Sequence, residues 1–281
     1  MLRKLYYLLS PSQRLLVRRI VFYPVDLWET LTGKRDSSIP PRSMIYTGAG
    51  DFVSAGKVYV SFFLKYGGLQ PHHRVLDVGS GIGRMALPLT TYLNEKGSYE
   101  GFDVVETGVK WCQKNISAKH PLFRFQHINL RNDLYSSSGH NASTFRFPYP
   151  DADFDFVFLT SVFTHMLPDE TENYMKEVSR VLKPGGTCLA TFFVFDAGKK
   201  GSHGNGKFRF EHNMGHYKLM DNKVKSANVA FESSYIEKKL AHENNLKIKH
   251  MIHGYWNGGP QSVENDFQDI IVFSKNKQDA E

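Results

Sequence analysis

The chain has 281 residues, 41% of them hydrophobic and 22% charged, which suffices for one large domain with a buried core. Two cysteines, Cys112 and Cys188, are too few for a disulfide framework or a metal cluster, and we expect both to be packing residues. No run of about 18 apolar residues exists, which argues against a membrane-spanning helix. The apolar N-terminal stretch is interrupted at Ser10 and Pro11 and is too short for a secretory signal. We therefore expect a cytoplasmic protein.

The formal net charge of +7 favours an anionic partner such as nucleic acid, anionic lipid or an acidic substrate. The basic residues are scattered, with no run of five or six, which argues against nucleic acid. Residues 1–32 alternate leucines and other apolar residues with arginines. This pattern predicts a basic amphipathic helix, or a pair of helices, able to lie on the inner face of a membrane. Packing on the domain or an oligomer contact is the alternative. Gly33–Arg42 has the composition of a linker.

The stretch 74–84 reads R-V-L-D-V-G-S-G-I-G-R. Its apolar half predicts a buried parallel strand, and a helical pattern begins at Ile82 and continues to Leu93. The order strand, glycine turn, helix places backbone N–H groups beside a ligand. A dinucleotide fingerprint needs its third glycine at position 84, where Arg84 stands. The Asp77 carboxylate would repel a pyrophosphate but suits a cationic amino group. Both features argue against an NAD-dependent oxidoreductase.

Further strands follow in chain order, and polar residues stand where they end. The second, 99–104, carries Asp103, placed to accept hydrogen bonds from ribose hydroxyls. Asn129 follows the third strand, and Thr160 to His165 follow the fourth. Open α/β sheets bind ligands at this edge. We expect strands at 99–104, 123–128, 154–159, 187–195, 246–250 and 269–273, the last two as an antiparallel hairpin, and helices at 52–66, 108–116, 168–182 and 232–245.

The remaining segments are two loops and an insertion. A glycine-bearing loop at 44–51 precedes the first domain helix and could close over a ligand. A polar loop at 131–146 is expected near the mouth of the site. The segment 196–230 is too long for a tight connection, and we interpret it as an inserted cap with a basic face. Residues 1–40 are then an extension and linker, and 41–281 one domain.

Four motifs together resemble one bacterial group of class I methyltransferases that depend on S-adenosylmethionine (SAM). They are V-L-D-V-G-S-G-I-G-R (75–84), S-V-F-T-H (161–165), R-V-L-K-P-G-G (180–186) and a late G-Y-W…Q-D (254–256 and 268–269). The resemblance implies an α/β fold: a Rossmann-like, doubly wound seven-stranded sheet, mostly parallel with an antiparallel last strand, and helices on both faces. It also implies SAM as the cofactor and methyl transfer as the reaction. The cofactor-binding positions expected on this basis are Asp77, Gly79, Ser80, Gly81, Gly83, Arg84, Asp103, Val104, Asn129, Leu130, Thr160 and Ser161.

One of these positions departs from the family pattern. Such enzymes often carry an acid after the third strand to receive the adenine amino group, and Asn129 stands there instead. Its side-chain carbonyl can still accept that hydrogen bond, more weakly.

His165 is the first candidate for a base that takes a proton from a substrate hydroxyl. A histidine that merely holds the loop is the competing interpretation, and His212 and His216 are secondary candidates. No N-P-P-Y-type sequence ends the fourth strand, where Thr160 and Ser161 stand. This favours O-methylation of a small-molecule, sugar or lipid-linked acceptor. The histidine spacings match no metal site, so no metal is expected. A non-catalytic scaffold at a membrane surface is the alternative function, and the oligomeric state is left open.

Overall fold

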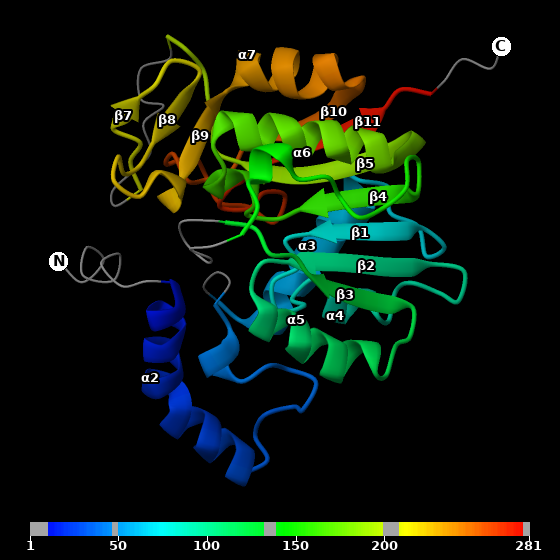
Figure 1. The fold of residues 1–281 in the computed structure, drawn as a ribbon, viewed down its shortest axis with the longest axis vertical. Helices are drawn as coiled ribbons and strands as arrows, with labels where there is room; N and C mark the ends of the chain where they lie inside the picture. The colour runs from blue at the N-terminus through cyan, green and yellow to red at the C-terminus, as the bar shows by residue number, and fades with distance from the viewer. Residues whose placement is uncertain (1–10, 47–49, 132–138, 199–207, 278–281) are drawn as a thin grey trace.

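The computed structural model describes residues 11–46, 50–131, 139–198 and 208–277 (Figure 1). Its centre is a seven-stranded sheet with the strand order β10-β11-β5-β4-β1-β2-β3. Only β11, the last strand in the chain, runs antiparallel to both of its neighbours. The predicted α/β architecture is therefore confirmed. The strands are β1 (Arg74–Val78), β2 (Ser98–Asp103), β3 (Phe123–His127), β4 (Phe154–Leu159), β5 (Leu182–Phe192), β10 (Leu246–Ile252) and β11 (Asp269–Lys275).

Helices cover both faces of this sheet (Figure 1). Alternate residues of a strand point to opposite faces, and the core is divided accordingly. Leu76 and Val157 pack beneath α6 and the α7 segment, whereas Val75 and Phe156 pack against α3, α4 and α5. The helical elements are α3 (Phe52–Lys65), α4 (Ala86–Leu89), α5 (Glu106–Cys112) continued by η2 (Gln113–Ser117), α6 (Pro168–Val181), and α7 (Ser233–Tyr235) continued by η6 (Ile236–Ala241) and η7 (His242–Asn244), with short turns η1 (Arg42–Met44), η3 (Ala142–Thr144), η4 (Phe163–His165) and η5 (Lys225–Ala227).

The helix expected over 82–93 is a prediction that the structure corrects. Residues 79–85 form an irregular turn, and α4 is limited to Ala86–Leu89. Pro88 lies inside this segment and has no N–H group to donate to the carbonyl four residues earlier. The apolar spacing that suggested a longer helix is still used, because Ile82, Ala86 and Leu89 are fully buried.

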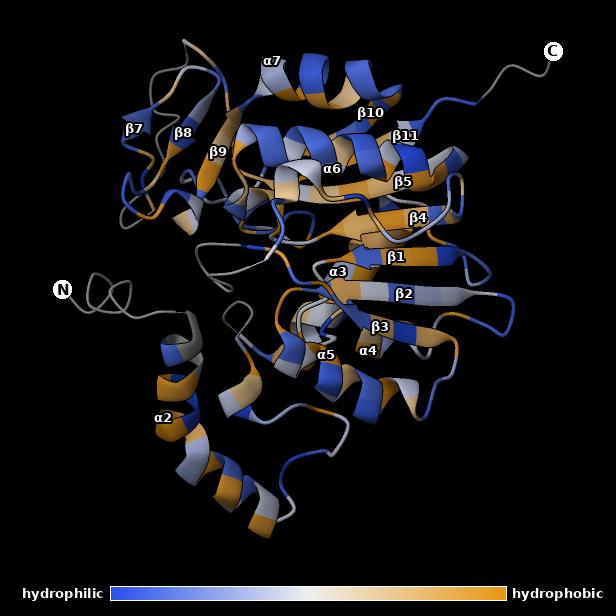
Figure 2. Ribbon diagram, viewed as in Figure 1, coloured by the Kyte–Doolittle hydropathy of each residue, from blue (hydrophilic) through white to orange (hydrophobic). Residues whose placement is uncertain are grey.

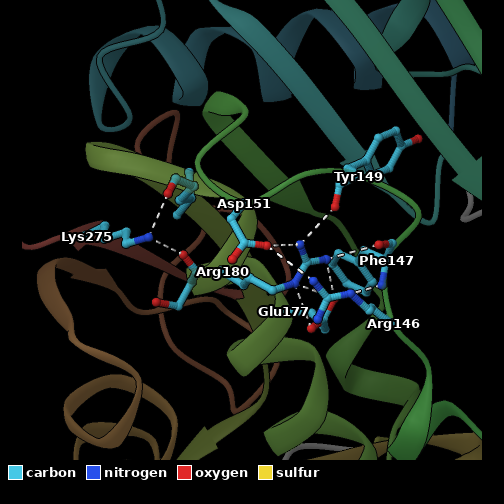
Figure 3. Close-up of polar contacts among 9 residues, drawn as sticks. Arg146, Phe147, Tyr149, Asp151, Glu177, Arg180 and Lys275 are labelled. Carbon is cyan, nitrogen blue, oxygen red and sulfur yellow. Dashed lines mark hydrogen bonds and ion pairs between the residues drawn. The ribbon is translucent and has the colours of Figure 1, made fainter.

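The motif R-V-L-K-P-G-G at 180–186 fixes the end of α6 (Figure 3). The Arg180 guanidinium donates to the carbonyl oxygens of Phe147 and Tyr149 and pairs with the buried carboxylate of Glu177. Lys275 of β11 donates to the carbonyl oxygens of Ser179 and Leu182. The motif therefore connects α6, the 147–151 segment and the sheet, away from the carboxyl ends of the strands.

The segment interpreted as a cap, together with the residues that flank it, forms a second, small sheet. Its four strands lie in the order β6-β9-β8-β7. An aromatic cluster around Phe193, Phe210 and Trp256 packs against it. Residues 199–207, which include Lys199, Lys200, His203 and Lys207, lie outside the described residues. The strands are β6 (Val194–Phe195), β7 (His212–Asn213), β8 (Tyr217–Leu219) and β9 (Val229–Glu232).

Near the N-terminus a single helix, α2 (Pro11–Leu31), lies apart from the sheet and its covering helices (Figure 1). The first ten residues lie outside the described residues, so the predicted pairing of two helices concerns residues only partly described. No helix in the described chain is both long and apolar enough to cross a bilayer.

Candidate functional site

A cavity of about 700 Å³ opens at the carboxyl ends of β1, β2 and β4. Eleven of the thirteen residues predicted from the sequence border it, including the candidate base. Gly83 and Asn129 do not. The predicted residues that border the cavity are Asp77, Gly79, Ser80, Gly81, Arg84, Asp103, Val104, Leu130, Thr160, Ser161 and His165.

Asp77 is the second-last residue of β1 and is almost fully buried, with an exposed fraction of 1%. Its Oδ2 accepts a 2.5 Å hydrogen bond from the Tyr99 hydroxyl, while its Oδ1 has no hydrogen-bond partner among the described residues. Burial raises the pKa of Asp77 to about 8, the Tyr99 bond lowers it, and the nearby Asp103 raises it further. A buried acceptor without a partner is costly, and a cation entering the cavity beside it would satisfy it.

The glycine turn follows directly, and its glycines do different things. Gly79 and Gly81 have φ values of +81° and +57° and border the cavity. Gly83 has φ +78°, but a Cβ there would lie 2.7 Å from the Ile116 side chain and 3.0 Å from that of Cys112. Gly83 thus permits the turn to pack on α5 and η2. Gly79 also leaves room for the Val162 side chain, which would lie 2.6 Å from a Cβ there, but Gly79 and Gly81 border the cavity and can admit a ligand.

Asp103 ends β2 and joins two loops. Its Oδ2 accepts from the Gly81 N–H and its Oδ1 from the Val105 N–H, both at 2.8 Å. The Tyr46 hydroxyl donates to Oδ1 at 3.5 Å. Burial raises the pKa of Asp103, and the two backbone donors oppose this shift. A carboxylate has about four acceptor positions, so Asp103 can fix these loops and still accept from hydroxyl groups of a ligand.

The region after β3 differs from the expectation. Asn129 is exposed, its backbone carbonyl accepts from the His140 N–H, and it does not border the cavity. Leu130 and Glu170 do. Glu170 lies in the first turn of α6, where its Oε2 accepts from the Leu167 N–H. The sequence carries no signal for Glu170 as a site residue, because an acid in the first turn of a helix is ordinary capping chemistry.

His165 lies in η4, just beyond β4, and its ring is oriented by the insertion. Nδ1 lies 2.9 Å from the carbonyl oxygen of Ser226 in η5. A carbonyl oxygen can only accept, so Nδ1 carries the proton, and in the neutral ring Nε2 keeps its lone pair. Burial lowers the pKa of His165, and the carbonyls of Ser226 and Ala227 oppose this. Burial therefore favours the neutral ring, in which Nε2 can act as a base.

The other end of the cavity is built mainly from residues that the sequence did not indicate. The buried Tyr59 of α3 donates through its hydroxyl to Asp266, and Tyr255 and Phe267 stack edge-on at 5.5 Å. All four border the cavity. The late G-Y-W…Q-D motif was the available signal: Asp269 accepts from the Trp256 indole N–H at 2.7 Å and so holds this loop.

Ser161 has φ +59°, which is rare for a residue with a side chain. Its N–H donates to Thr191 Oγ1 at 2.7 Å and its hydroxyl donates to Gln268 Oε1 at 3.1 Å. These bonds tie the end of β4 to the wall formed after Asp266, and strained backbone of this kind clusters at ligand sites.

The expected basic face of the cap does not border the cavity among the described residues. His216 stacks on Tyr235 at 4.4 Å, and the Lys218 ammonium lies 4.0 Å from the centre of the Phe195 ring. Of the described residues of the insertion, Phe208 alone borders the cavity. His212 also lies away from it, so the secondary candidate bases are separated from the site. The described residues contain no group of three metal-ligating side chains.

Among known protein families, the model described as a methyltransferase domain matches residues 76–190. These residues are a class I, SAM-dependent methyltransferase domain. The match contains most of β1, the glycine turn, β2, β3, β4 and most of β5, and therefore all twelve predicted cofactor positions.

Solved structures of other proteins have a fold similar to that of this chain. A SAM-dependent methyltransferase from Methanosarcina mazei is 20% identical, with a TM-score of 0.50 over 76% of this chain and 98% of that one. The [4+2]-cyclase SpnF is 16% identical, with a TM-score of 0.52 over 96% and 97% of the two chains. At these identities the likeness shows the fold alone.

Curated relatives match only part of their own length. The tRNA N(3)-cytidine methyltransferase METTL2 of Gallus gallus is 32% identical over 126 residues, 44% of this chain and 31% of that protein. The ubiquinone/menaquinone biosynthesis C-methyltransferase UbiE of Wigglesworthia glossinidia brevipalpis is 25% identical over 150 residues, 53% of this chain and 54% of that protein. The chain thus spans about a third to a half of the length of these relatives.

The cavity of the methyltransferase domain fits SAM by its donor and acceptor set. The orphaned Asp77 Oδ1 suits the ammonium group, and Asp103 has acceptor capacity for hydroxyls. A dinucleotide would bring the negative charge of its pyrophosphate beside the buried carboxyl groups of Asp77 and Asp103, which disfavours such a cofactor.

Proposed function

We propose that the whole protein transfers the SAM methyl group to a hydroxyl of a small-molecule, sugar or lipid-linked acceptor. The observation that carries the proposal is the position of His165, which borders the same cavity as Asp77 and Asp103. Residues 41–281 would act as one domain, 196–230 as its insertion and 1–40 as an extension. Two free, buried cysteines fit a reducing compartment such as the cytoplasm.

Cofactor binding is assigned to the β1, β2 and β4 ends. Asp77 would hold the ammonium group, the Gly79–Gly81 turn would contact the amino-acid part, and Asp103 would accept from the ribose hydroxyls. Since Asn129 lies outside the cavity, we assign the adenine contact to Leu130 and Glu170, which border it.

Bound SAM supplies a methyl group that is already activated on a sulfonium. Holding the acceptor in line can then contribute on the order of 7–11 kcal/mol in favourable cases. His165 takes the acceptor proton on Nε2, because its Nδ1 is committed to the Ser226 carbonyl. The developing imidazolium is stabilised by that same carbonyl. The ring wall at Tyr59, Tyr255 and Phe267 would exclude water from the acceptor.

Transfer to nitrogen or carbon is the second candidate, because the names of the curated relatives include a tRNA N(3)-cytidine methyltransferase and a C-methyltransferase. A tRNA acceptor requires cationic surface around the mouth of the cavity. Arg84 and Arg131 border the cavity, but no described basic residue of the insertion does, and His216 and Lys218 of the insertion pack against aromatic rings. The hydroxyl acceptor is therefore preferred.

An acceptor screen with methyl-labelled SAM tests the proposal. Hydroxylated small molecules, sugars, lipid-linked sugars and tRNA are offered to wild type, His165→Gln and the exposed control His72→Gln. We expect label on oxygen of a non-nucleic-acid acceptor, with kcat lowered about 10²–10⁴-fold in His165→Gln and unchanged in the control. SAM affinity should not change in either variant. Label only on nitrogen of RNA or protein would overturn the proposal. Full activity of His165→Gln would show that His165 is not the base.

A further inference from the structure

Large apolar side chains are exposed mainly on one helix. Among the described residues, nine of the fourteen exposed large apolar side chains lie on α2. Ile20 is 66% exposed and Leu31 77%. Apolar residues recur along this helix, which stands away from the body of the protein (Figure 2). The nine are Leu16, Val17, Ile20, Val21, Tyr23, Val25, Leu27, Trp28 and Leu31.

These side chains share one face. At 3.6 residues per turn, eight of them fall within roughly 160° of the helix circumference, between Tyr23 and Val21. Arg18 and Arg19 lie beside the two edges of that face. Trp28 and Tyr23 lie within it, and such rings, apolar in body and polar at the tip, favour a boundary between water and hydrocarbon.

The acidic residues of α2 face the other way and are neutralised within the chain. Asp26 and Glu29 are each 8% exposed. Asp26 accepts from the backbone N–H groups of Arg42 and Ser43 at 2.7 and 3.1 Å. Glu29 pairs with the Arg42 guanidinium at 2.7 Å. The linker thus covers the acidic face and leaves outward an apolar face edged by arginine.

We propose that α2 lies in the headgroup region of an anionic bilayer, with its apolar face toward the acyl chains. Apolar area supplies most of the attraction in such a contact, and basic residues near the surface add to it. A second copy of the chain fits less well. A coiled-coil seam is narrower than this face, and Pro24 removes a helix N–H in the middle of it. The contact does not depend on the methyl transfer proposed above.

Vesicle binding of the full chain tests the proposal. Vesicles of phosphatidylcholine, with and without about 30% phosphatidylglycerol, are titrated into the wild type and into the double variant Ile20→Glu/Leu31→Glu. Glutamate keeps helix propensity while placing charge on the apolar face. Leu122→Glu/Val263→Glu, which alters exposed apolar side chains elsewhere, is the matched control. Trp28 gives a direct signal, because the other two tryptophans, Trp111 and Trp256, are buried.

We expect wild type and the control to bind anionic vesicles at least about tenfold more tightly than neutral ones, with a blue shift of tryptophan emission. The α2 double variant should lose that binding. Arg19→Gln should weaken it about fivefold, the effect of one basic residue near an anionic surface. Vesicle binding that survives in the α2 variant would overturn the proposal. So would absence of vesicle binding, including the case in which wild type is a dimer that the α2 variant dissociates. Unchanged SAM binding shows that the variants are folded.

Discussion

Asp77 is the residue in which burial, charge and ligand choice meet. It is nearly inaccessible, one carboxyl oxygen has no partner in the part of the chain that the structure describes, and its pKa is raised to about 8. Without a cation in the cavity it therefore stays protonated at neutral pH. An ammonium group beside it favours the ionised form, so binding of a cationic amino acid must release the Asp77 proton.

This predicts a pH-dependent affinity for SAM. Between pH 5.5 and 7.5 the Kd should tighten by up to about tenfold per pH unit, because binding needs an ionised Asp77 while an α-amino group stays largely protonated in that range. Calorimetry in buffers of different ionisation enthalpy should detect the proton released. Asp77→Asn should bind more weakly at pH 7.5 and lose most of the slope. An equal slope in wild type and variant would assign the proton to another group.

The site also shows where residue-level prediction stops. Asp77, Asp103 and the first two glycines were predictable because strand ends and a short motif are local in sequence. The contact between Tyr59 and Asp266 joins positions 207 residues apart, and nothing local in either segment indicates it. Asn129 was predicted from the family pattern alone, and the structure exposes it outside the cavity.

At the scale of elements, continuous apolar runs predicted the strands well. β4 has the predicted bounds, β3 ends one residue earlier than predicted, and β2 begins and ends one residue earlier. The helix predicted after the glycine turn was too long. The apolar residues do recur at helical spacing, but Pro88 lacks the N–H group that a helix beginning at residue 82 would need at this position. The small sheet β6–β9 was not predicted, since its strands have only two to four residues each and give too short a pattern to recognise.

The Arg180 cluster gives an element-scale prediction about stability (Figure 3). Arg180→Met leaves the Glu177 carboxylate, which is 5% exposed, without its guanidinium and frees two carbonyl oxygens. We expect the free energy of unfolding to fall by about 3–5 kcal/mol. Lys183→Met is the control: it removes a more exposed ion pair with Asp155 and should cost about 0–1 kcal/mol. Urea unfolding measures both, and similar losses would show that Arg180 is not a buried anchor.

For the whole molecule, one cavity brings together the strand ends, the insertion and the loop before α3. The insertion contributes the carbonyl that orients His165, and the loop contributes Tyr46 beside Asp103. The helix α2 stands outside this arrangement and exposes its apolar face. The molecule therefore separates a site for SAM and its acceptor from a surface suited to a bilayer, and a lipid-linked acceptor would use both.

The most direct test of the central claim is a calorimetric titration with SAM, S-adenosylhomocysteine and NADH. It compares wild type, Asp103→Ala and Glu106→Ala, the last replacing an exposed carboxylate three residues further along. We predict micromolar binding of both adenosyl ligands to wild type and the control, at least about 30-fold weaker binding to Asp103→Ala, and none of NADH. Failure of the folded wild type to bind either adenosyl ligand, or a preference for NADH, would contradict the assignment of this cavity to SAM.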